Sequence, residues 1–176
     1  MLLLKSNDNF LLQSISALLH QKNITHTTDK DKKYFFSIEI THNLKVIEFK
    51  GLSQSAKLNT PLNVKYILQN ILSMFSKYSI DINGAQFYPL KQSISFQNKE
   101  TYLGNIHFII LSHLLLNIDD GSDKSDLYQS IWPSDKDIQL NKLDTHLTNL
   151  KNFLKEKINF NFFFSARSGL IHVRID

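Results

Sequence analysis

One segment of the sequence, residues 140–157, combines leucines and polar side chains at a spacing that could support contacts with nucleic-acid bases and phosphates. Its leucines recur at steps of three and four residues, which predicts a helix with one buried face. They are Leu143, Leu147, Leu150 and Leu154. The polar and basic side chains left outward or flanking are Lys142, Thr145, His146, Thr148, Asn149, Lys151, Asn152 and Lys155. Asparagine can form two hydrogen bonds with adenine, threonine can contact the methyl group of thymine, and lysine can reach guanine or phosphate. The pattern therefore predicts a surface that could contact DNA, and the alternative is a solvated, mildly basic helix face, as most such faces are.

Arg167 is a second candidate contact, in the turn between two β-rich runs at 159–165 and 170–175. An arginine at the tip of a hairpin can enter a minor groove or contact a backbone phosphate. The helix itself contains no arginine. Because lysine reproduces the bidentate guanine contact of arginine poorly, we do not expect strong sequence specificity.

Other kinds of chemistry find little support in the sequence. It contains no cysteine, and none of its seven histidines lies four residues from another, as two metal ligands on one helical face would. The acidic run at 119–123 lacks the alternating ligands and distal glutamate of a calcium loop. No nucleophile elbow or glycine-rich phosphate loop occurs. We therefore expect a protein that is not an enzyme and that binds no metal or cofactor.

The elements expected around this helix are short strands and two further helices. Strands are predicted at 87–90, 93–96 and 100–103. The apolar run 106–116 predicts a buried helix, and another helix starts at a cap, Ser122 or Asp123, and stops at Pro133. With the two terminal strands, these elements predict an α+β domain over residues 86–176.

Residues 1–80 predict a smaller domain of α/β type. Strands are expected at 2–4, 24–28, 34–40 and 44–50. The last two should form a hairpin, since three residues are too few for a parallel crossover. Amphipathic spacing predicts helices over 10–19 and 62–78, and residues 51–59 form a polar loop. Asn83-Gly84 indicates a boundary between the domains within residues 79–86.

Charge is uneven along the 176 residues, whose formal net charge is +4. Residues 1–85 hold ten lysines against six acidic residues, whereas residues 86–176 hold ten basic and ten acidic residues. Within the second half, residues 141–175 hold six bases against Asp144 and Glu156, which suits a surface that faces phosphates.

The opening residues give no secretion signal and no apolar run reaches ~18 residues, so we expect a cytoplasmic protein without a membrane partner.

Residues 87–176 resemble the effector domain of response regulators of the OmpR/PhoB type. The matching stretches are residues 103–116 as the first helix, DLYQSIWP as the second, and LDTHLTNLKNFL as the recognition helix. The best match, Leu143-Asp144-x-His146-Leu147-x-x-Leu150, is similar to that family's V-D-x-H-I-x-x-L run. The resemblance implies a winged helix-turn-helix that binds double-stranded DNA and regulates transcription.

Residues 1–80 resemble the receiver domain of the same family at their two ends only, which implies a truncated, degenerate receiver. A receiver holds a divalent cation with clustered carboxylates, but the matching positions Ser6-Asn7-Asp8 keep only one. Thr60 precedes Pro61 where the family has a lysine, and Glu39 is not a residue type that accepts the phosphoryl group in this family. The resemblance therefore implies an atypical regulator that works without phosphorylation.

Receivers of this family associate through the helix that corresponds to residues 62–78. The resemblance thus implies a homodimer. Its association surface would comprise Val64, Ile67, Leu68, Ile71, Leu72 and Phe75.

Two functions remain open at this stage. The first is a dimeric DNA-binding transcription regulator. The second is a protein-interaction adaptor whose winged helix no longer binds DNA specifically and which contacts a partner, such as RNA polymerase, through residues 133–139. The neutral overall charge of the second half favours the adaptor.

Overall fold

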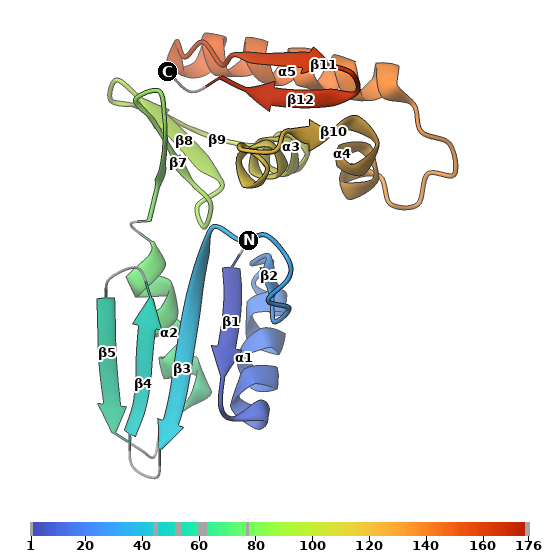
Figure 1. Ribbon diagram of the computed structural model, residues 1–176. Coiled ribbons are helices and arrows are strands. Elements are labelled where there is room, and N and C mark those ends of the chain that lie inside the picture. Colours follow the sequence, from blue (N-terminus) through green and yellow to red (C-terminus); the bar gives the residue numbers. More distant parts are fainter. Residues whose placement is uncertain (1, 44–45, 52–53, 60–62, 77, 175–176) are drawn as a thin grey trace. The chain divides into compact units, whose positions relative to one another are not determined.

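The chain forms two compact units, Met1–Tyr78 and Ser79–Asp176, here called unit 1 and unit 2. The computed structural model describes residues 2–43, 46–51, 54–59, 63–76 and 78–174 (Figure 1). Each unit is mixed α and β. No helix in these residues is both long and apolar enough to span a bilayer.

Unit 1 is a five-stranded sheet with two helices. Its strands are β1 (Leu2–Ser6), β2 (His26–Thr27), β3 (Phe36–Asn43), β4 (Val46–Gly51) and β5 (Gln54–Asn59). Their order is β2-β1-β3-β4-β5, with β1 parallel to both of its neighbours and β3, β4 and β5 antiparallel. The helices α1 (Asn9–Gln21) and α2 (Val64–Phe75) contact each other and lie on one side of the sheet (Figure 1).

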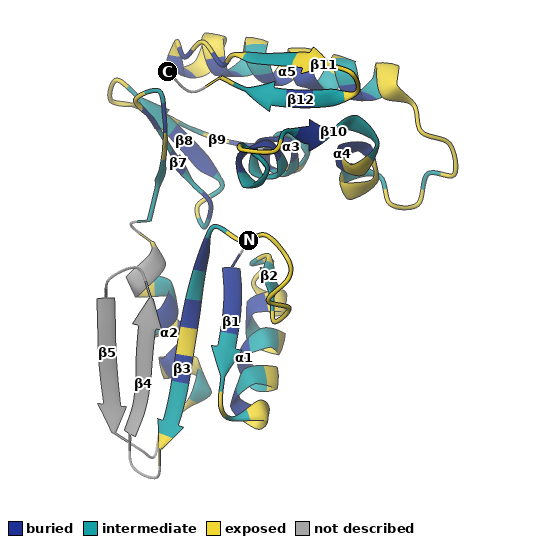
Figure 2. Cartoon of the chain, viewed as in Figure 1, coloured by how far each residue is buried: buried dark blue, intermediate teal, exposed yellow. Residues whose placement is uncertain are grey.

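The core of unit 1 follows from the apolar periodicity of these elements. In β3 the residues alternate, with Phe36, Ile38 and Ile40 buried and Glu39 exposed (Figure 2). The helices contribute one apolar face each, as the amphipathic spacing predicts. Their buried residues are Leu11, Ile15 and Leu19 in α1 and Ile67, Leu68 and Ile71 in α2.

Two expectations for unit 1 need correction. Residues 54–59, expected as part of a loop, form β5 and pair along their length with β4. This sequence is mostly polar, but an edge strand can be held by backbone hydrogen bonds to its single neighbour. The strand expected at 24–28 shrinks to His26–Thr27. The hairpin between β3 and β4 is confirmed, with Asn43 opposite Val46.

Unit 2 begins with an antiparallel meander of β6 (Ile80–Ile82), β7 (Ala85–Tyr88), β8 (Ser93–Phe96) and β9 (Lys99–Tyr102). Residues 79–86 were expected to contain the boundary between the domains, and most of them belong to the β6–β7 hairpin of unit 2. Asn83 and Gly84 do make a turn, both with positive φ, at the tip of this hairpin. The turn signal was therefore correct, and the division between the two units lies just upstream of this hairpin, between Tyr78 and Ser79.

Three helices and a small sheet complete unit 2. The helices are α3 (Asn105–Leu116), α4 (Lys124–Ile131) and α5 (Leu140–Ile158), all close to their predicted positions. The three-stranded sheet has the order β10-β12-β11, from β10 (Ser122–Asp123), β11 (Phe164–Arg167) and β12 (Leu170–Val173). The strand expected from 159 starts only at Phe164. Asn159 adopts a left-handed conformation that ends α5, and Phe160 and Phe162 then pack into the core without strand pairing.

The leucine stripe of α5 lies at the centre of this core. Leu143, Leu150 and Leu154 are fully buried and Leu147 is 2% exposed, which confirms the predicted buried face (Figure 2). The opposite face of α5 is thereby left for solvent or a partner.

Candidate nucleic-acid interface

Contacts between α4 and α5 fix the position of α5 within unit 2. Asp123 caps α4 by accepting hydrogen bonds from the backbone amides of Ser125 and Asp126. Lys124 Nζ then pairs with Asp144 Oδ1 of α5 at 2.7 Å. This ion pair joins the first turn of one helix to the first half of the other, and it neutralises an acidic residue that adjoins Thr145 of the predicted contact surface.

A cluster of four side chains, here called the Asp135 cluster, holds the turn between the two helices. It consists of Tyr128, Trp132, Asp135 and Lys142. The Tyr128 hydroxyl donates to Asp135 at 2.6 Å, Lys142 Nζ pairs with the same carboxylate at 3.1 Å, and this ammonium lies 4.0 Å from the Trp132 ring centre. The hydrogen bond from Tyr128, and then that from Lys142, lower the pKa of Asp135. Lys142, predicted to contact DNA, is therefore already bound within the protein.

His146 and Lys151 are also only partly exposed. The His146 ring centre is 5.3 Å from that of Trp132, and Lys151 Nζ lies 4.3 Å from the centre of the Phe164 ring in β11. A cation over an aromatic face is an attractive contact. Lys151 thus links α5 to the terminal hairpin as well as carrying charge.

The exposed face of α5 carries a stripe of neutral polar residues, Thr145, Thr148, Asn149 and Asn152, here called the reading stripe. Their spacing of three and four residues places them on one side of the helix. Thr145 and Thr148 donate their hydroxyls to the backbone carbonyls of Asn141 and Asp144, both at 2.9 Å. Lys155 continues the exposed face toward the C-terminus.

Asn141 belongs to the same face and was not predicted. It is exposed and precedes Thr145 by one helical turn. The spacing rule that identified Thr145 would have found it, because four residues upstream is the same side of the helix. The Asp135 cluster had no such signal, since it depends on tertiary packing of Trp132 against α5.

The hairpin tip presents the last predicted contact. Ser168 and Gly169 have φ values of 51° and 83° and form the two-residue turn that connects Arg167 to its partner Leu170. Positive φ at both turn residues matches a type I′ hairpin, and glycine takes that conformation without strain. Arg167 is exposed at this tip. The reading stripe, Lys155 and Arg167 are therefore the predicted residues that the structure leaves accessible in unit 2.

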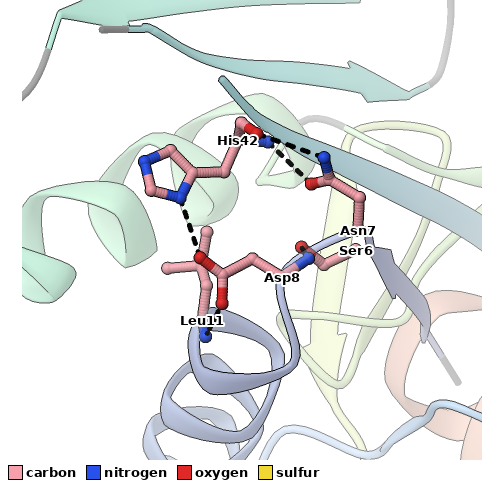
Figure 3. Close-up of polar contacts among 5 residues, drawn as sticks. All are labelled: Ser6, Asn7, Asp8, Leu11 and His42. Atoms are coloured by element: carbon pink, nitrogen blue, oxygen red, sulfur yellow. Dashed lines mark hydrogen bonds and ion pairs between the residues drawn. The ribbon is translucent and has the colours of Figure 1, made fainter. Parts of the chain in front are cut away.

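In unit 1 the carboxylate that matches a receiver's metal-binding position has a structural role (Figure 3). Asp8 caps α1 by accepting from the Leu11 amide at 3.0 Å, and its other oxygen lies 2.8 Å from His42 Nδ1. The amide of Asn7 brackets the backbone of His42, donating to its carbonyl at 3.1 Å and accepting from its N–H at 2.8 Å. The hydrogen bond from Leu11, followed by that from His42, lowers the pKa of Asp8. Glu39 is exposed on β3, and the Thr60-Pro61 pair lies outside the described residues.

The residues predicted for association divide between the core and the surface. Ile67, Leu68 and Ile71 are at most 3% exposed and pack inside unit 1. Val64 and Leu72 are partly exposed, and the side chain of Phe75 lies outside the described residues. The outward face of α2 instead presents residues such as Tyr66, which is 49% exposed. An association surface on α2 must therefore use this face.

No protein-family model and no curated protein sequence matches the chain. Among solved structures, the DNA-binding domain of CadC from E. coli is similar, with a TM-score of 0.48 and 10% sequence identity. That match covers 57% of this chain and 95% of the CadC domain.

Proposed function

We propose that the protein is a DNA-binding transcription regulator in which unit 2 acts as a winged helix-turn-helix. In this proposal α5 enters the major groove as the recognition helix and the β11–β12 hairpin is the wing. The observation that carries it is the reading stripe, a solvent-exposed row of groups able to bond to bases on a helix whose other face is buried core. Arg167 at the hairpin tip adds a cation that can reach the phosphate backbone.

Regulation is proposed to work without phosphorylation. The acidic side chain at the receiver-like position, Asp8, is occupied as a helix cap and by His42. No group of three or more His, Cys, Asp or Glu side chains suited to a metal ion occurs among the residues described. These arrangements support a structural role for the end of β1, in an atypical relative of response regulators.

Dimerisation is proposed through the outward faces of α1 and α2, so that two recognition helices could read two half-sites. Neither helix contains an acidic residue. Leu18, Leu68 and Leu72 line a hollow between the helices. Phe10 and Tyr66 add exposed aromatic surface, at 77% and 49% exposure.

An adaptor that binds protein is the alternative, and one observation favours it. Ile138 and Leu140, at the end of the turn between α4 and α5, are 44% and 39% exposed. Exposed apolar side chains on a turn can contact a protein partner such as RNA polymerase. An adaptor of this kind would bind no duplex in a salt-sensitive manner.

A salt titration of duplex binding tests the proposal. The affinity of the full chain should fall as salt rises, with a log-log slope of about −0.9 for each phosphate neutralised. Removing two contacts in Lys155→Ala/Arg167→Ala should make the slope shallower by up to about 2. Lys30→Ala/Lys32→Ala, which removes the same charge from exposed positions of unit 1 outside α1 and α2, is the matched control and should have the smaller effect.

Two outcomes would contradict the proposal. Absence of salt-sensitive binding to any duplex would favour the adaptor. An equal loss in both double variants would show that overall charge, and not the surface of α5 and the hairpin, governs binding.

A further inference from the structure

The reading stripe has a chemical character that residue types alone do not reveal. Its members, at positions 145, 148, 149 and 152, span eight residues or about 10 Å of helix. Base pairs stack at about 3.4 Å, so this length faces roughly three steps of a duplex. A helix in a major groove reads sequence through such a set of side chains.

The two threonines offer methyl groups to a partner. Each hydroxyl donates to a carbonyl of the preceding helical turn, at 2.9 Å in both cases. The hydroxyl hydrogens are thus used within the helix, so each threonine offers a partner its Cγ2 methyl group and a hydroxyl oxygen that can only accept. A threonine methyl fits against the C5-methyl group of thymine, which lies in the major groove.

The two asparagines offer free amides. Asn149 and Asn152 are exposed, and neither side-chain amide has a hydrogen-bond partner within the described part of the chain. The carboxamide of asparagine can donate to adenine N7 and accept from its N6 amino group. A guanine presents two acceptors on the same edge, which suits arginine or lysine instead.

The cations that could read guanine are withdrawn from this face. Lys142 is held by Asp135 and Trp132, and Lys151 lies over the Phe164 ring. Lys155 is exposed, but it lies beyond the stripe, three residues closer to the C-terminus of α5 than Asn152. Its place suits a phosphate contact.

From these four observations we infer that α5 reads A·T base pairs in the major groove. Asn149 and Asn152 bond to adenine, and Thr145 and Thr148 contact thymine methyl groups. This specificity rests on the proposed function, because it requires that α5 meets a duplex. The specificity goes beyond the proposed function because it names the base pair and the groove that α5 reads.

The test compares the affinity of the full chain for four labelled duplexes of equal length at one moderate salt concentration. Their base pairs are A·T, G·C, A·U and inosine·C. We expect A·T to bind at least about fivefold more tightly than G·C, the low end for one bidentate contact. Inosine·C resembles A·T in the minor groove and G·C in the major groove, so it should bind as weakly as G·C. A·U lacks the thymine methyl group and should lie between A·T and G·C.

Three results would overturn the inference, each in a distinct manner. Equal affinity for A·T and G·C would show that the stripe reads no base. Equal affinity for A·T and inosine·C would place the discrimination in the minor groove. Equal affinity for A·T and A·U would show that the threonines do not contact the thymine methyl groups. Absence of salt-sensitive binding to all four would instead reject the proposed function.

Variants assign the effect to residues. Asn149→Ala/Asn152→Ala should lose the preference for A·T over G·C and keep salt-dependent binding. Thr145→Ser/Thr148→Ser keeps both hydroxyls and removes both methyl groups, so it should lose the difference between A·T and A·U. Gln13→Ala, an exposed amide on α1, is the control. Unchanged preferences in variants with wild-type thermal unfolding would contradict the assignment.

Discussion

Lys142 illustrates how the surroundings of a residue decide which chemistry it can perform. As a residue type it suggests a guanine or phosphate contact, and its place on the helix was predicted correctly. Its ammonium nevertheless lies between Asp135 and Trp132. The sequence could not reveal this, because the turn that brings Asp135 beside α5 is defined by tertiary packing. By contrast, the exposure of Thr145, Asn149 and Asn152 followed directly from helical spacing.

His107 provides a prediction about pH at the same scale. Burial, with a smaller contribution from His146, lowers the pKa of His107 below its ordinary value of about 6.5. The unfolded chain therefore binds more protons than the folded chain once the pH falls below about 6.5. The free energy of unfolding should fall as pH decreases through this range, and level off below the lowered pKa of the folded state.

The check is chemical unfolding at pH 7.5, 6.5 and 5.5. His107→Gln should show a shallower loss of stability with decreasing pH than the wild type. His20→Gln removes an exposed histidine and is the matched control. If the two variants share the wild-type pH dependence, desolvation of His107 does not contribute to it.

Among the elements, those with a strong apolar period were predictable and those defined by pairing were not. The helices α2 and α5 lie within a few residues of their predicted bounds because their leucines and isoleucines repeat at helical spacing. The strand β5 was missed, since Gln54–Asn59 has no apolar alternation and is held by its pairing with β4. Residues 160–163 were overpredicted as strand, because Phe160 and Phe162 alternate with exposed residues as in a strand but pack into the core without a pairing partner.

The buried stripe of α5 gives a prediction about stability. Leu150 is fully buried, so Leu150→Ala should lower the free energy of unfolding by about 2 to 5 kcal/mol through lost burial and a cavity. Urea unfolding followed by tryptophan fluorescence measures this for unit 2, because Trp132 is the single tryptophan of the chain. Asn152→Ala on the exposed face should change the free energy of unfolding by no more than about 0.5 kcal/mol. Equal effects of the two changes would contradict the assigned faces of α5.

At the scale of the whole molecule, the proposed dimer gives a further prediction. Sedimentation should give twice the monomer mass of 20.4 kDa at micromolar concentration. Tyr66→Arg should shift the mass toward the monomer, because it places like charges near each other on the outward face of α2. Tyr102→Arg, at a 72% exposed tyrosine of unit 2, should leave it unchanged. A monomer at every concentration would reject the dimer. Dissociation by Tyr102→Arg and not by Tyr66→Arg would show that the interface involves unit 2 and not the outward face of α2.

The pairing of Lys124 with Asp144 and of Lys142 with Asp135 has one more consequence. Over its first three turns, α5 offers a partner almost no net charge, so long-range attraction to a duplex must come from lysines and arginines elsewhere on the chain. Capture and discrimination would then belong to different groups. A non-cognate duplex, held by capture alone, would be released within a short residence time, while a cognate duplex would be retained by contacts that added salt hardly weakens.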